Sequence, residues 1–156
     1  MRIDRIALNG FRNYDFETAE FSPGTNVLYG ENAQGKTNLL EAVYMLAMGR
    51  SFRTRFDREL VGFDFSSAEI LADVMSHDRE QTINIALRPG TAKKILVNGV
   101  KKTASELSET VNTVLFCPGT LADVSLTVLT VLYFMLSSSP SPEKSRCIGF
   151  AACCVK

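Results

Sequence analysis

Gly30-Glu31-Asn32-Ala33-Gln34-Gly35-Lys36-Thr37 is the most informative motif of this chain. It matches G-x-x-x-x-G-K-[ST], a loop in which backbone N–H groups cradle phosphates and a lysine reaches the terminal phosphate oxygens. Residues 26–29, which precede it, are typical of a short buried strand, and apolar residues follow at helical spacing over 39–47. Strand, loop and helix therefore occur in the order that this motif requires.

Each residue type in the loop has a physical role. Gly30 and Gly35 allow backbone angles closed to other residues and let the main chain approach an anion. The helix that follows offers unpaired N–H groups to a phosphate. Lys36 is expected between the β- and γ-phosphates of ATP, and the Thr37 hydroxyl is expected to bind Mg²⁺. The alternative is a glycine-rich turn that merely begins a core helix.

Length and composition narrow the class of protein. The 156 residues suffice for one domain with a core, and 46% of them are apolar. Seventeen basic side chains balance seventeen acidic ones, so any DNA binding must rest on local clusters of charge. The N-terminus has no secretory signal, which favours the cytoplasm. The four cysteines lack metal-ligand spacing and are interpreted as free thiols.

The rest of the first 118 residues predicts an α/β fold with an antiparallel meander. A helix is expected over 36–48, ended by Gly49 as its C-cap. Asn98-Gly99 indicates a tight hairpin, and Thr103 with Glu106 forms the sequence pattern of a capping box. Strands are expected over 1–8 (with a break at 9–14), 16–21, 26–29, 68–97 as the meander, and 113–116.

Two basic clusters are candidate DNA contacts. Arg50, Arg53 and Arg55 lie close together around a phenylalanine, as in phosphate-contacting surfaces, although a solvated loop would have the same composition. Lys93 and Lys94 precede the Asn98-Gly99 hairpin, where they could bind a nucleic-acid backbone or blunt an edge strand.

The pattern changes after Pro118. Residues 124–136 are almost wholly apolar or threonine, yet too few to span a membrane, which takes about 20. No apolar strand ends in a convincing Mg²⁺-binding aspartate, since Asp73 and Asp123 both lie in poor contexts. A signature loop that could close over a nucleotide is also missing, so the chain has parts for binding ATP and lacks visible parts for hydrolysing it.

Several short motifs, in order, resemble the RecF family of bacterial DNA replication and repair proteins, which are related to SMC-type ATPases. They cover about residues 1–118 and are jointly specific. The matching stretches are residues 11–14 (Phe-Arg-Asn-Tyr), 30–42, 49–53, 97–99 and 114–118.

The resemblance implies the N-terminal lobe of an ABC-type ATPase head that binds ATP and Mg²⁺. It places Arg12 and Asn13 close to the nucleotide. It further implies binding to single-stranded or gapped DNA, an ATP-dependent homodimer, work with other recombination mediators in recombinase loading, and a part in the SOS response.

Residues 119–156 depart from the family, and the C-terminal lobe is missing from the chain. A frameshift or truncation would explain a tail that is divergent or disordered. Two alternatives stay open: a non-enzymatic, nucleotide-dependent binding module whose tail docks a partner, and a small-molecule kinase that uses the same loop.

Overall fold

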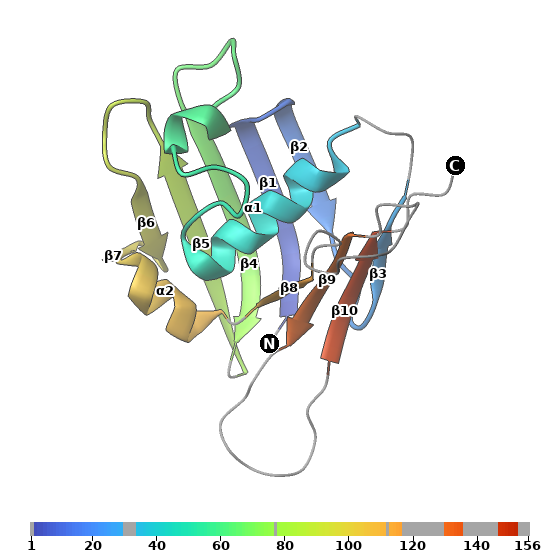
Figure 1. Ribbon diagram of the computed structural model, residues 1–156. Helices are drawn as coiled ribbons and strands as arrows, with labels where there is room; N and C mark the ends of the chain where they lie inside the picture. The colour runs from blue at the N-terminus through green and yellow to red at the C-terminus, as the bar shows by residue number, and fades with distance from the viewer. Residues whose placement is uncertain are drawn as a thin grey trace.

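The computed structural model describes residues 2–29, 34–76, 78–111, 113–116, 130–135 and 147–152. Its main layer is a six-stranded sheet in the order β2-β1-β4-β5-β6-β7 (Figure 1). Every neighbouring pair in it is antiparallel. The strands are β1 (Arg2–Phe11), β2 (Tyr14–Glu20), β4 (Ala68–Ser76), β5 (Arg79–Leu87), β6 (Lys94–Val97) and β7 (Val100–Lys102).

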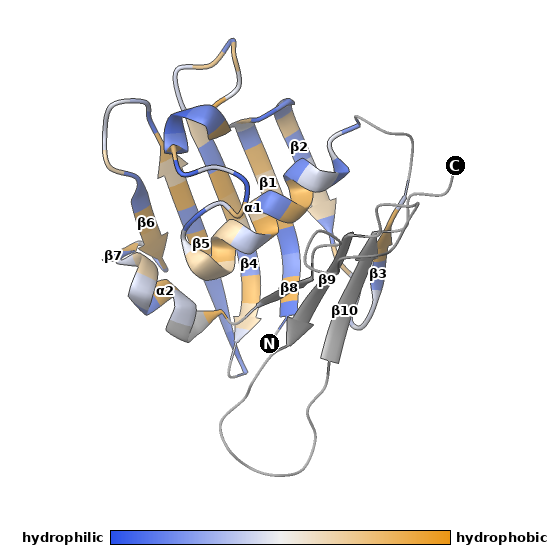
Figure 2. Cartoon of the chain, viewed as in Figure 1, coloured by the Kyte–Doolittle hydropathy of each residue, from blue (hydrophilic) through white to orange (hydrophobic). Residues whose placement is uncertain are grey.

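The predicted meander is confirmed over β4, β5 and β6. Along β4 buried Ala68, Ile70 and Ala72 alternate with outward-facing neighbours, because successive side chains of a strand point to opposite faces. Figure 2 shows this alternation of hydrophobic and hydrophilic residues along the strands. The predicted hairpin is also present, with positive φ angles of 51° at Asn98 and 79° at Gly99, the combination that a type I′ turn requires.

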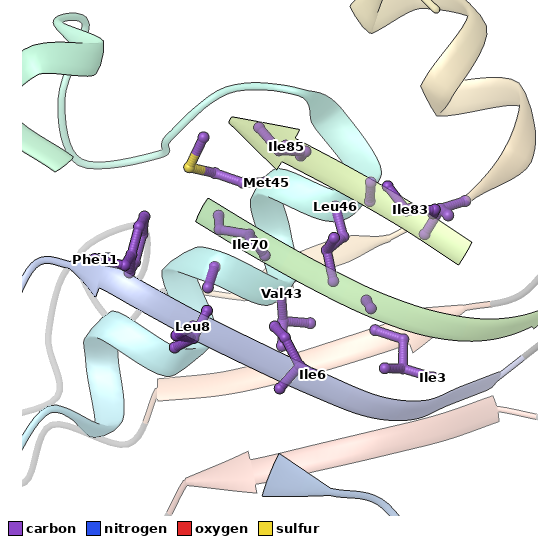
Figure 3. Packing of buried hydrophobic residues seen from close by; sticks show 14 of the residues in the cluster. Ile3, Ile6, Leu8, Phe11, Val43, Met45, Leu46, Ile70, Ile83 and Ile85 are labelled. Carbon is purple, nitrogen blue, oxygen red and sulfur yellow. The ribbon is translucent and has the colours of Figure 1, made fainter. Parts of the chain in front are cut away.

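Helix α1 (Lys36–Met48) lies across the buried face of this sheet (Figure 1). Val43 and Leu46 of the helix pack over Ile6 of β1 and Ile70 of β4, as Figure 3 shows. Gly49 ends the helix with a φ of 63°, and its N–H donates to the Met45 carbonyl, which confirms the predicted C-cap. This packing holds the start of α1 in a fixed place relative to the sheet.

Strand β1 is longer than its sequence indicated. The break predicted at residues 9–14 is confined to residues 12 and 13, because Gly10 takes a φ of +59° and the strand continues to Phe11. Only glycine fits there, since a Cβ would lie 2.6 Å from the Ser67 carbonyl oxygen. The chain then turns over two residues, and Arg12 carries a positive φ of 56°.

A second sheet has the order β3-β10-β9-β8. Its strands are β3 (Asn26–Leu28), β8 (Val114–Phe116), β9 (Thr130–Met135) and β10 (Cys147–Ala152), and β10 runs parallel to β3. The prediction of a buried strand before the loop is wrong in part, because Val27 is 52% exposed and Tyr29 84% exposed. β3 lies outside the main sheet, and only its Leu28 packs against the core.

The second sheet includes two segments of the predicted tail, β9 and β10. The division of the chain at residue 118 and the divergent nature of residues 119–156 stay predictions. The single histidine, His77, and three of the four cysteines, Cys117, Cys153 and Cys154, lie outside the described residues.

The short helix α2 (Ala104–Thr110) begins with the predicted capping box. The Thr103 N–H donates to the Glu106 carboxylate, and the Glu106 N–H donates to the Thr103 hydroxyl. The bond from the Thr103 backbone, followed by those from Lys102 and the Thr103 hydroxyl, lowers the pKa of Glu106 to about 2. A 3-10 helix, η1 (Asp57–Leu60), connects α1 to β4. Within the described residues, no helix is long and apolar enough to cross a membrane.

Candidate functional site

The start of α1 has the features of an anion site. Gly35 is its N-cap with a φ of 93°, no side chain caps the helix, and its first turn contains no acidic residue. The N–H groups of Asn38 and Leu39 donate to the Gly35 carbonyl at 2.7 and 3.0 Å, so the helix is tightly formed from its first turn. An uncapped helix N-terminus favours phosphate. Thr37 is exposed there, as a Mg²⁺ ligand must be.

The described part of the predicted loop runs from Gln34 onward. Gly30, Glu31, Asn32 and Ala33 lie outside the described residues. Their predicted contacts with ATP therefore stay predictions.

The turn between β1 and β2 closes around Gly35. A Cβ at Gly35 would lie 2.7 Å from the Tyr14 hydroxyl and 3.0 Å from Asn13 Oδ1. Burial, and secondly the charge of Glu17, raises the pKa of Tyr14, which keeps its phenol neutral at physiological pH. The structure thus brings Asn13 beside the loop glycine, together with Tyr14, which belongs to the motif at residues 11–14 but had no predicted role.

Glu41 of α1 joins three segments of the chain. Its side chain is fully buried, and its carboxylate accepts two hydrogen bonds from Arg12, at 2.9 Å from Nε and 2.8 Å from Nη2. Ser51 Oγ and Arg53 Nη1 also donate to it, at 2.5 and 3.2 Å. A buried carboxylate with this many donors holds the β1–β2 turn and the segment after α1 against the same helix.

Glu41 was not predicted as a site residue, although its position in the sequence carries a signal. Helical spacing places it among the apolar residues of the buried face of α1, where an unpaired carboxylate would be costly. A charged residue at such a position indicates a partner brought by the fold, and Arg12 and Arg53 are those partners.

Asn38 links the β1–β2 turn to Arg53, which lies in the segment after α1. Its Nδ2 donates to Asn13 Oδ1 at 2.7 Å, and its Oδ1 accepts from Arg53 Nη1 at 2.6 Å. Asn38 lies one helical turn before Glu41, so both side chains occupy the same side of α1. Arg53 therefore contacts both of them.

The predicted DNA contacts fall into two places. Arg50, Arg53, Arg55 and Lys93 line one open hollow of about 590 Å³. Lys93 also pairs with Asp57 at 3.0 Å. Arg53 is held by Glu41 and Asn38, yet its side chain stays 41% exposed.

Lys94 does not join the other four. It lines a separate hollow of about 390 Å³ with Glu69 and Asn84, on the sheet face opposite α1. Lys94 begins β6 on its exposed face, opposite buried Ile95, whereas Lys93 precedes the strand and pairs with Asp57. The five predicted residues therefore do not form one surface.

The comparison with protein families decides the identity of the fold. The family described as "RecF/RecN/SMC N terminal domain" matches residues 2–142. The chain belongs to this family. The N-terminal position of the match agrees with the predicted lobe, and the α/β fold with its antiparallel meander is confirmed.

Curated relatives of the RecF/RecN/SMC family agree with this assignment. The chain is 43% identical over 119 residues to the "DNA replication and repair protein RecF" of Acetivibrio thermocellus, covering 76% of this chain and 32% of the relative. It is 45% identical over 124 residues to the protein of the same name from Symbiobacterium thermophilum, covering 78% of this chain and 32% of the relative. The chain thus spans about a third of the length of these proteins.

Solved structures agree as well. A structure described as the recombination mediator protein RecF with ATP in the RecFOR pathway has a TM-score of 0.71 and 41% identity, covering 75% of this chain and 33% of that one. An SMC ATPase studied for ATP-driven dimerisation and DNA-stimulated activation has a TM-score of 0.64 at 23% identity, covering 70% of this chain and 77% of that one. The second likeness concerns the fold alone.

Proposed function

We propose that this chain binds ATP with Mg²⁺ at the start of α1, as the nucleotide-binding lobe of a RecF-like protein of DNA replication and repair. The observation that carries the proposal is the uncapped N-terminus of α1 at Gly35, where the closely packed Tyr14 and Asn13 side chains leave no room for a Cβ. A phosphate fits such a place, because backbone N–H groups reach it without a Cβ in the way.

Each residue of the site has its own role in binding the nucleotide. Backbone N–H groups of the Gly30–Thr37 loop bind phosphate oxygens, and Lys36 neutralises the terminal phosphates. The Thr37 hydroxyl is the candidate ligand for Mg²⁺, which supplies positive charge between the β- and γ-phosphates. Asn13 borders the site from the β1–β2 turn, and Arg12 holds that turn in place through its bonds to Glu41.

Isothermal titration of the purified chain with ATP tests this function. We expect binding of one ATP per chain, weakened when Mg²⁺ is removed with EDTA, because the Thr37 hydroxyl would hold the metal and the metal would supply positive charge to the phosphates. Circular dichroism on the same sample would establish that the chain is folded. A folded chain that does not bind ATP would refute the proposal.

We further propose that the hollow formed by Arg50, Arg53, Arg55 and Lys93 binds phosphates of DNA. Four cations and one acid, Asp57, line it, so it attracts a polyanion although the whole chain is neutral. The RecF-like ATP-dependent homodimer, the recombination mediators as partners, and a cytoplasmic location are parts of the same proposal.

Replacing Arg50 and Arg55 together with alanine tests the DNA surface. We expect single-stranded DNA to bind more weakly irrespective of its sequence, and the slope of log K against log salt to fall by about 1.4, because two phosphate contacts are lost. Fluorescence anisotropy over a salt series measures both. Lys94→Ala is the matched control, since Lys94 lies in the other hollow. An equal loss in both variants would place DNA elsewhere on the molecule.

A further inference from the structure

The donors and acceptors in the hydrogen bonds around Asn38 can be assigned in only one way. Arg53 Nη1 lies 2.6 Å from one end of the Asn38 amide. A guanidinium donates and cannot accept, so the atom that faces it must be the amide oxygen. The other end of Asn38 is then its NH₂ group, which donates to Asn13 at 2.7 Å.

The same logic fixes the amide of Asn13. Because Asn38 donates to it, the Asn13 atom in that bond is its oxygen, and its NH₂ group is turned the other way. Asn13 is exposed, and its Nδ2 donates no hydrogen bond to a described residue. This donor lies on the turn that packs against Gly35.

The chain of hydrogen bonds through Arg53 and Asn38 to Asn13 begins at Glu41. Glu41 is fully buried and holds Arg53 by an ion pair of 3.2 Å, while its bidentate pair with Arg12 anchors the turn that carries Asn13. Arg12 is also bound through Nη1 to the Glu59 carbonyl at 2.9 Å. Both the position of Asn13 and the orientation of its amide therefore depend on one carboxylate.

We propose that Glu41, Arg53 and Asn38 are positioning residues that orient the Asn13 amide so that its NH₂ group donates to a phosphate oxygen of the bound nucleotide. This inference rests on the proposed function and deepens it. The reversed amide would present an oxygen to the phosphates, which repel it. The network thus selects the attractive orientation before the nucleotide arrives, and binding costs less reorganisation.

Asn38→Asp removes the donor of the hydrogen bond to Asn13 with almost no change in the shape of the side chain. A carboxylate at residue 38 still accepts from Arg53 but cannot donate to Asn13, so the Asn13 amide turns its NH₂ group toward residue 38. We expect the Kd for ATP with Mg²⁺, measured by isothermal titration, to rise by about tenfold from the reversed contact. The new charge also acts on the phosphates directly.

A double-mutant cycle separates the two effects. The Asn38→Asp change is measured in the natural chain and again in an Asn13→Ala background, where no amide remains to reverse. The charge acts in both backgrounds, so we expect the rise in Kd to be at least fivefold smaller in the second. Equal rises in the two backgrounds would overturn the positioning role.

Two controls complete the experiment. Asn84→Asp places the same change beside Glu69 on the opposite sheet face, and we expect it to lower Tm without altering the Kd. Lys36→Ala tests the nucleotide site itself. If Lys36→Ala abolishes ATP binding and Asn38→Asp has no effect, the nucleotide site is supported and the positioning role is wrong. If Lys36→Ala has no effect on ATP binding, the proposed function is wrong.

Discussion

Replacing Lys36 with alanine is expected to raise the Kd for ATP by at least about 100-fold, equivalent to about 3 kcal/mol. Lys36 is the first residue of α1, directly after Gly35, where the helix offers N–H groups but no formal charge. Backbone dipoles alone carry about half a unit charge at a helix end, whereas the terminal phosphates of ATP carry several negative charges. The ammonium group of lysine supplies the remaining compensation.

Isothermal titration with ATP and Mg²⁺ measures this loss. The fold should survive, because the apolar residues that pack α1 on the sheet, such as Val43 and Leu46, are untouched. Lys94→Ala removes the same charge on the opposite face of the sheet and should leave the Kd unchanged. If affinity persists in Lys36→Ala, the nucleotide does not bind at this loop.

The features that the sequence predicted correctly are local ones. The limits of α1, the turn at Asn98 and Gly99, and the capping box at Thr103 each depend on residues within a few positions. Propensity, turn chemistry and capping act over that range. The phosphate-loop motif is local in the same way, since its residue order carries its own mechanism, and its role in binding ATP stays a prediction.

The features that the sequence did not predict depend on pairs of distant residues. Arg12 and Glu41 are 29 positions apart, so the buried position of Glu41 indicates that it needs a partner but not that the partner is Arg12. Gly10 was interpreted as the end of a strand because glycine is common in turns, yet here it allows the Ser67 carbonyl to approach. Lys93 and Lys94 were grouped because they are adjacent in the chain, whereas Lys93 precedes β6 and pairs with Asp57, and Lys94 begins the strand on its exposed face.

The second large effect is expected at Glu41. Glu41→Leu should lower the free energy of unfolding by about 3 kcal/mol, because Arg12 is left buried without a counter-charge. The side chain of Arg12 is only 19% exposed and is tied to the Glu59 carbonyl, so it cannot turn freely into water. Arg53, at 41% exposure, can do so at lower cost. Urea denaturation followed by circular dichroism measures the change.

The double variant Glu41→Leu with Arg12→Met identifies the cause. If the loss comes from an uncompensated buried charge, removing that charge should restore part of the stability, since apolar replacements of both partners are often neutral. If the loss comes from packing of the helix alone, the double variant should be less stable than Glu41→Leu. We expect the former order, because Glu41 contacts the turn through its two carboxylate oxygens, each of which accepts from Arg12. The ion pair would then be kept for the placement of Arg12 and Asn13 beside Gly35 rather than for stability.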